Sequence, residues 1–207
     1  MAIQEMPTSP DFSDTRFGLV SNTQTDLTSP IKQSSQILEL PGARWRATYA
    51  LPSMSKVQAV EWISFLLQLR GRAGRFYGFD PSFNPRTPRG SAGSFTLRVA
   101  GASQSGATLI IDGADPLESN VFRTGDYLAY DVGSGRQLHA VTADVSADSS
   151  GEMTVSIEPP IRTSPDNNAL IITTNPSCVM RLVDDEVGWD VSRAQRAGIA
   201  FDAIEVF

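Results

Sequence analysis

Apolar and polar residues alternate along much of the chain, and this alternation predicts many short strands. The first fifteen residues are polar and hold two prolines, so we expect residues 1–15 to form a flexible arm. Pro41-Gly42 is a strong turn signal between two strand-like stretches, which predicts a hairpin over residues 31–51. Its second strand places two sets of side chains on opposite faces: Trp45, Ala47 and Tyr49 on one, and Arg44, Arg46 and Thr48 on the other.

One amphipathic helix is predicted over residues 54–70. Ser55 followed by Gln58 fits a capping box, Ser53 is the rival N-cap, and Gly71 marks the end of the helix. Apolar residues recur at three- and four-residue steps, at Val57, Val60, Ile63, Leu66 and Leu67. The residues Trp62, Phe65 and Leu69 widen this stripe. We therefore expect a helix that is buried on more than one side, with Leu67 in the core.

A linker separates the helical part from a second group of strands. Residues 80–93 hold three prolines and two glycines, and they follow a short aromatic strand at 75–79. Residues 94–165 read as short strands between glycine turns, at a spacing of about 8–12 residues that is typical of a small antiparallel barrel. The chain then returns to longer strands and closes with strict alternation over residues 199–207, which predicts a terminus tied into a sheet.

These elements predict a mainly β protein with one α-helix, in two domains. The first domain covers residues 1–90 and 167–207. The second is a small antiparallel β-barrel at residues 91–166, inserted into the first. Because proline- and glycine-rich segments flank the insert, we expect it to be an autonomous, peripheral unit.

The composition supports a folded core but distributes charge unevenly. The 207 residues are 41% hydrophobic and 19% charged, which excludes global disorder. Residues 1–39 carry two basic and five acidic groups, residues 40–98 nine basic and two acidic, and residues 99–207 six basic and sixteen acidic. Such a split suits nucleic-acid binding through one part, or attraction between basic and acidic faces of identical copies, and we favour the second. The third interpretation is that the charges average out in the folded chain.

The scarcity of cysteine and histidine restricts the chemistry. Cys178 and His139 are single residues of their kind, so an intrachain disulfide is impossible and a Cys/His zinc site nearly so. Both lie in predicted strands, and we expect them to be structural. No apolar run approaches the about 18 residues that span a bilayer, and the first residues lack a secretory signal. We therefore expect no membrane insertion, and synthesis and folding in a cytosol.

The sequence motifs of the remaining candidate sites are incomplete. Residues 71–75 resemble a phosphate-binding loop only loosely, because they follow a helix and lack the Gly-Lys-Ser/Thr ending. Asp184, Asp185 and Glu186 fit a solvated hairpin turn better than a cation site, and the carboxylates around Gly113 (Asp112, Asp115 and Glu118) lack nearby aromatic residues to stack a sugar. We predict no catalytic residue, metal ligand or cofactor, and expect that the protein is not an enzyme.

The arginines between residues 70 and 98 are the one feature with a candidate binding role. An exposed arginine face binds DNA phosphates or the carboxylates of a neighbouring subunit. The candidate contact residues are Arg70, Arg72, Arg75, Arg86 and Arg89.

The order of these features resembles distal tail proteins, the tail-tip or baseplate ring proteins of long-tailed bacteriophages. The stretch LPSMSKVQAVEWISFLLQLRGRAGRFYGFDP resembles their ring-forming domain. The stretch FRTGDYLAYDVGSGRQLHAVTADVSADSSGEMTVSIEPPIRTSP is similar to the small barrel inserted in such proteins. The closing CVMRLVDDEVGWDV and GIAFDAIEVF look like the returning strands of the first domain. The resemblance spans residues 16–207 and rests on structural patterns, with no catalytic signature.

The resemblance implies a structural virion protein at the distal end of the tail. Its first domain is then a belt-like β-sandwich that forms a homohexameric ring. Such rings join the tail tube protein to the tip hub protein and surround the channel through which DNA passes without sequence-specific binding. They have no active site and need no cofactor. Two alternatives stay open: a receptor- or glycan-binding tail-tip module, and a nucleic-acid-binding protein that uses the arginine-rich 70–98 segment.

Overall fold

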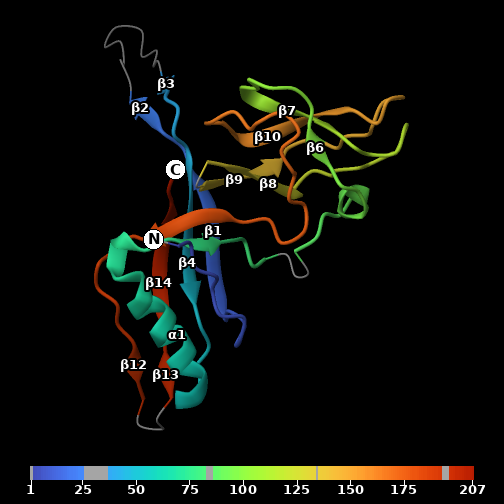
Figure 1. The fold of residues 1–207 in the computed structure, drawn as a ribbon. Coiled ribbons are helices and arrows are strands. Elements are labelled where there is room, and N and C mark those ends of the chain that lie inside the picture. The colour runs from blue at the N-terminus through green and yellow to red at the C-terminus, as the bar shows by residue number, and fades with distance from the viewer. Residues whose placement is uncertain (1, 26–36, 83–85, 134, 193–195) are drawn as a thin grey trace, which may run out of the picture.

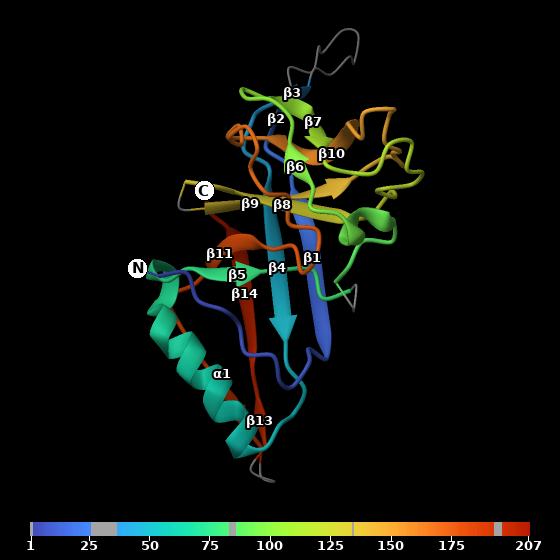
Figure 2. The ribbon, with the colours of Figure 1, turned by 45° about the vertical axis from the view of Figure 1, so that its right-hand side comes forward.

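The molecule is elongated and mainly β, with two five-stranded antiparallel sheets near its two ends (Figure 1). The computed structural model describes residues 2–25, 37–82, 86–133, 135–192 and 196–207. One α-helix occurs among these residues, as predicted. The helix packs beside the first sheet. The second sheet lies past the end of the first sheet that is farther from β12 (Asp190–Val191) and β13 (Ala197–Gly198) (Figures 1 and 2).

The first sheet is built from strands that come from both ends of the chain. In spatial order they are β1 (Asp14–Val20), β4 (Arg44–Ala50), β14 (Ala200–Glu205), β11 (Cys178–Leu182) and β5 (Phe76–Gly78). Every neighbouring pair is antiparallel. The closing strand lies between β4 and β11, which confirms the prediction that the chain terminus is tied into a sheet.

The predicted hairpin of residues 31–51 is wrong. β4 pairs with β1 and β14, while β3 (Ile37–Glu39) pairs with β2 (Thr23–Thr25). Residues 26–36 of the prediction lie outside the described residues. The β1–β4 register sets Leu19 opposite Trp45 and stacks the ring of Phe17 on that of Trp45, with centroids 5.0 Å apart. These long-range apolar contacts outweigh the local turn signal at Pro41-Gly42.

The alternation in β4 decides the two faces of this sheet, as predicted. The buried side chains are Trp45, Ala47 and Tyr49, and the exposed ones are Arg44, Arg46 and Thr48. Tyr49 packs with Phe201 on the neighbouring β14, and Phe201 packs with Trp62 of the helix. The buried face is therefore the one that the helix covers.

The helix α1 (Lys56–Leu69) forms where the sequence predicts it but turns a different face to the core. Ser55 is the N-cap, and its backbone N–H donates to Gln58 Oε1 at 3.2 Å. Arg70 adopts the left-handed conformation and leads into a 3₁₀ turn, η1 (Gly71–Ala73). The buried helix residues are Ala59, Trp62, Phe65, Leu66 and Leu69.

The prediction that Leu67 lies in the core is wrong. Leu67 is 55% exposed and Val60 is 52% exposed. The rings of Trp62 and Phe65 pack edge-on or tilted against Phe76 and Phe201 of the first sheet. Because these rings bury more area than valine or leucine, packing them inward turns the Val60–Leu67 side of the helix outward.

The N-terminal segment packs against the body, so the predicted flexible arm is also wrong. The backbone of Gln4 donates to Arg75 O at 2.9 Å and accepts from the N–H of Tyr77 at 3.0 Å. The indole N–H of Trp62 donates to Ser9 O at 3.0 Å. The polar composition of the segment conceals Met6, which is buried, and Phe12, whose ring packs against those of Tyr49, Trp62 and Phe79.

The second sheet uses only residues from the middle of the chain. In spatial order its strands are β6 (Arg98–Val99), β7 (Gly106–Asp112), β10 (Met153–Ile161), β9 (Gly135–Val141) and β8 (Tyr127–Val132). A 3₁₀ turn, η2 (Ser91–Ser94), precedes them, and the ribbon of β12 (Asp190–Val191) and β13 (Ala197–Gly198) follows near α1. The predicted small barrel is present as a curled half-barrel.

One segment contacts both edges of the half-barrel. Ile171 N–H donates to Leu97 O beside β6 at 3.0 Å, and Ile172 N–H donates to Ala129 O on β8 at 2.7 Å. The half-barrel encloses its own apolar core, which includes Leu109, Ile111 and Val155. The division into domains at residues 90/91 and 166/167 stays a prediction.

The junction of the two sheets is buried and polar. Glu205 at the end of β14 is fully buried and binds the guanidinium of Arg162, which follows β10. Glu205 Oε2 also accepts the N–H of Trp45 at 3.0 Å, and the indole N–H of Trp45 donates to Leu138 O on β9 at 2.8 Å. Leu138 and Ala129, from the second sheet, belong to the core of the first. These contacts tie the half-barrel to the first sheet, and the autonomy of the insert stays a prediction.

Candidate functional site

His139 is a buried structural residue. Its Nδ1–H donates to Pro159 O at 2.6 Å, and Nε2 lies 3.1 Å from the Tyr130 hydroxyl, which donates to it. The Tyr130 ring also stacks on the imidazole. Burial lowers the pKa of His139 to about 4, so the ring is neutral at pH 7 and both of its nitrogens are occupied. A group in this state is not poised to move a proton to or from a bound substrate.

Cys178 is equally inaccessible. It is fully buried, and its Sγ lies 3.7 Å from Gly78 O. Burial raises the pKa of the thiol well above its ordinary value, which disfavours the reactive thiolate. The structural role expected for this residue agrees with its surroundings.

The acidic triplet after β11 is divided between two roles. Asp185 accepts from Arg72 Nη2 at 2.6 Å, from Arg72 Nε at 3.0 Å and from the Arg72 backbone N–H at 3.0 Å. These contacts lower the pKa of Asp185 to about 2. Asp184 and Glu186 instead line an open groove. Over the described residues, no group of three or more His, Cys, Asp or Glu side chains converges as a metal site would require.

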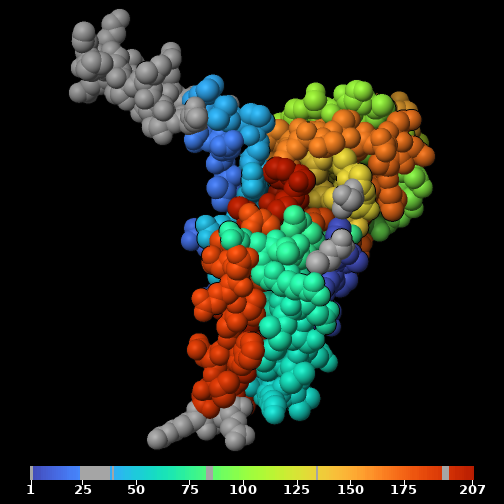
Figure 3. All heavy atoms as spheres, turned by 60° about the vertical axis from the view of Figure 1, so that its left-hand side comes forward, coloured from blue at the N-terminus to red at the C-terminus, as the bar shows by residue number. Residues whose placement is uncertain are grey.

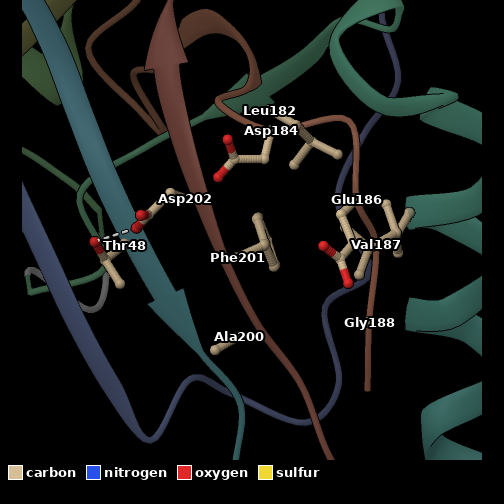
Figure 4. Close-up of a pocket in the computed structure, with 10 residues that line it drawn as sticks. Thr48, Leu182, Asp184, Glu186, Val187, Gly188, Ala200, Phe201 and Asp202 are labelled. Carbon is tan, nitrogen blue, oxygen red and sulfur yellow. Dashed lines mark hydrogen bonds between the residues drawn. The ribbon is translucent and has the colours of Figure 1, made fainter.

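This groove lies where β14 extends past the end of β11, and it encloses about 310 Å³ (Figure 4). Phe201 lies at its centre, with the carboxylates of Asp184, Glu186 and Asp202 around it. Thr48 Oγ1 donates to Asp202 Oδ1 at 2.5 Å. Apart from this hydroxyl, the polar side chains of the groove are all acidic among the residues described. The groove is therefore at most a weak, solvated binding surface for a cation, and it has no group that would bind an anion.

Two of the five predicted contact arginines are held by the loop around η1. Arg72 is bound bidentately by Asp185, as described above. Arg75 Nη1 lies within 3.5 Å of the carbonyl oxygens of Arg72, Ala73 and Gly74, to which it donates. Both guanidinium groups therefore stabilise the turn that ends α1, which reduces what they offer to a partner.

The other three arginines lie at separate places. The half-buried guanidinium of Arg86 stacks on Phe79, 3.5 Å from the ring centroid. Arg89 donates to Thr124 O at 3.0 Å, next to the second sheet. Arg70 is exposed and lines a hollow on α1. Of the five, Arg70 is the one that the structure leaves on a surface with apolar neighbours.

That hollow lies on the outer face of α1 and encloses about 480 Å³. Its lining residues are Val60, Ile63, Ser64, Leu67, Gln68 and Arg70. Figure 3 shows α1 at the surface, with the 184–192 segment beside it and its outer face uncovered. We call this surface the α1 groove. The periodicity of the sequence marked Val60, Ile63 and Leu67 as one stripe, but it could not tell that the stripe points away from the core.

A second, basic surface could not be predicted from the sequence, because the alternation of apolar and polar residues does not reveal the order of the strands in a sheet. On the face of the first sheet away from α1, Arg16, Thr48 and Asp202 lie in one row across β1, β4 and β14. Arg46 and Arg181 flank β14 in the next row. Arg46 Nη2 lies 3.7 Å from Asp202 Oδ2. The alternation of β4 assigned Arg46 to the polar face, but only the fold shows that Arg16 and Arg181 join it.

The structure thus presents two candidate contact surfaces, one apolar and one basic, and no assembled catalytic constellation among the residues described. No helix within the described ranges has the length and apolar character needed to cross a bilayer. No protein-family model matches the chain, and no curated protein sequence matches it.

Proposed function

We propose that the chain is a structural subunit of a phage tail tip, which assembles with further copies into a hexameric ring between the tail tube protein and the tip hub protein. The observation that carries the proposal is the exposed apolar face of α1. Val60 and Leu67 each expose more than half of their surface in the single chain. Contiguous exposed apolar surface of this kind marks contact with another molecule.

The energetic gain from covering this face is sufficient to matter. Fully burying an exposed valine or leucine side chain contributes about 1.5–3 kcal/mol. A contact that covers Val60 and Leu67 on every subunit repeats this gain around a closed ring. Cyclic closure also satisfies each interface without leaving a free one.

The proposed arrangement assigns a role to each half of the molecule. The first sheet with α1 is the ring-forming, belt-like β-sandwich domain, and the half-barrel is the inserted domain. The polar face with Arg16, Arg46 and Arg181 lines the channel, where basic side chains contact DNA phosphates irrespective of sequence. This assignment replaces the predicted channel role of Arg72 and Arg75, which bind within the chain.

Electron microscopy of the purified full chain tests the proposal. We expect ring-shaped particles with six-fold symmetry. Particles no larger than one chain, in a sample that is folded by circular dichroism, contradict it. A glycan array and the salt dependence of DNA binding test the receptor-binding and nucleic-acid-binding alternatives on the same sample.

A further inference from the structure

Leu117 combines two unfavourable features at one residue. Its side chain is 73% exposed, and its backbone lies in the left-handed region with φ 62°. The other described non-glycine residues with positive φ are Arg70, Ser103, Asn120, Asn168 and Asn175, all of them polar. A leucine gains nothing from this conformation in a free chain, because αL is costly for a residue with a branched apolar side chain. Such a residue points to a contact outside the chain.

The loop that carries Leu117 is held in place by backbone contacts. Leu117 N–H donates to Asp148 O at 2.8 Å, and Glu118 O accepts the N–H of Ala147 at 2.9 Å. Gly113 at the start of the loop has φ 97°, and a Cβ there would lie 2.7 Å from Thr96 O. The loop is therefore fixed against the half-barrel and presents Leu117 in one orientation.

The charge around Leu117 is acidic, and the charged residue that lines the α1 groove is basic. Asp115 is exposed beside Leu117, and Glu118 is half-exposed. Arg70 lines the C-terminal end of the groove, and Lys56 lies one helical turn before Val60 on the same side of α1. Glu5 and Glu61 line a neighbouring hollow, which shares Val60, Ser64 and Gln68 with the groove. An acidic loop with an exposed leucine thus complements an apolar groove that has an arginine at its C-terminal end.

The two surfaces lie far apart on the molecule. The loop between β7 and β8, drawn in yellow-green, projects from the half-barrel on the side away from α1 (Figures 1 and 2). They therefore cannot meet within one chain, and a contact between them joins different copies. Two copies can make it reciprocally about a two-fold axis, whereas a ring needs the heterologous form. Contacts of this type join copies head to tail, and they close into a ring when the rotation between copies allows it.

We propose that Leu117 of one copy inserts into the α1 groove of the next copy, between Val60 and Leu67. This inference rests on the proposed function, because it names the contact through which the ring forms. The carboxylates of Asp115 and Glu118 then lie near the guanidinium group of Arg70 at the end of the groove. The contact covers the exposed apolar residues of both surfaces and gives a reason for the conformation of Leu117.

Disulfide crosslinking of the full chain tests the contact. The double variant Leu67→Cys/Leu117→Cys is oxidised mildly and separated on a non-reducing gel. Cys178 stays in place, since it is buried and unreactive. The matched control is Val57→Cys/Leu117→Cys. Val57 is 82% exposed on the same helix but lies about 15 Å along its axis from Leu67, and a disulfide needs Cα atoms within about 7 Å.

We expect a ladder of covalent oligomers from the double variant and far less crosslinking from the control. An equimolar mixture of Leu67→Cys and Leu117→Cys single variants should give covalent dimers and nothing larger. If the chain forms rings by electron microscopy but the double variant shows no more crosslinking than the control, the contact is wrong and the proposed function stands. If the chain stays monomeric under all conditions, both fail.

Discussion

Glu205 and Arg162 form a buried ion pair that joins the last strand of the first sheet to the last strand of the half-barrel. Glu205 is fully buried, and the side chain of Arg162 is 10% exposed. Burial raises the pKa of the Glu205 carboxyl, and the guanidinium of Arg162 acts in the opposite direction. The pair therefore links the two sheets across their buried junction.

We predict that Arg162→Met lowers the free energy of unfolding by about 3–5 kcal/mol, because it leaves a buried carboxylate without its partner. Adding Glu205→Gln to this variant should recover part of the loss, since a neutral amide costs less to bury. The measurement is urea unfolding at pH 7. Arg46→Met is the control, because its ion pair with Asp202 is exposed and we expect a change below about 1 kcal/mol. Equal effects of Arg162→Met and Arg46→Met would show that the pair does not couple the sheets.

The adjacent residues Leu66 and Leu67 provide a matched test of the helix face. Leu66 is 1% exposed and Leu67 is 55% exposed. We predict that Leu66→Asp prevents folding, because a buried unpaired charge costs several kcal/mol, on the order of the stability of a whole domain. Leu67→Asp should fold, with a circular dichroism spectrum like that of the original chain, but should lose self-association. A folded Leu66→Asp protein, or an unfolded Leu67→Asp protein, contradicts the assignment of the two faces.

The sequence predicted the features of the fold that depend on neighbouring residues and failed for those that depend on residues far apart in the chain. The faces of β4 and the existence and capping of α1 follow from periods of two and of three to four residues, and both were predicted. The partners of β4 are residues 14–20 and 200–205, and pairing at that distance leaves no local signature. The orientation of α1 depends on which of its two apolar faces the neighbouring strands cover. The sequence does not show this, so Leu67 was wrongly predicted to lie in the core.

The candidate contact surfaces were predicted less well than the fold for the same reason. The arginine-rich segment suggested one basic face, but Arg72 and Arg86 find their partners, Asp185 and Phe79, inside the chain. Leu117 carried no signal in the sequence, because a single leucine in an acidic loop is ordinary. Its exposure and left-handed backbone are visible only in the folded structure.

The burial of His139 predicts a specific pH dependence. Its pKa falls from an ordinary value near 6.5 to about 4 in the folded chain, so the unfolded state binds more protons between these values. The contribution of neutral His139 is therefore fully present above pH 6.5 and is lost as the pH falls toward 4. At about 1.4 kcal/mol per pH unit, the loss amounts to about 3 kcal/mol.

The variant His139→Gln isolates this contribution, because glutamine does not titrate. We expect the free energy of unfolding of the original chain to fall more steeply than that of His139→Gln between pH 6.5 and 4. Urea unfolding at closely spaced pH values measures both slopes. Parallel curves for the two proteins would mean that His139 titrates normally in the folded chain.

Replacing residues 92–166 by a short Gly/Ser linker tests whether the half-barrel is separable. The deletion removes Arg162 and the Leu138 carbonyl, which leaves Glu205 and the indole N–H of Trp45 without these partners. We predict that the shortened chain is insoluble or unfolds at markedly lower urea concentration. A shortened chain that folds stably and forms rings would show that the junction is dispensable and that the Leu117 contact is not needed.

The central claim is that this chain assembles with copies of itself through the face of α1. The most direct test is the molar mass of the purified full chain in solution, measured by light scattering over a range of concentrations at low and moderate salt. We predict a discrete species of about six times the 22.4 kDa of one chain, and its reduction to single chains by Leu67→Asp. A mass of 22.4 kDa at every concentration, or an oligomer unchanged by Leu67→Asp, contradicts the claim.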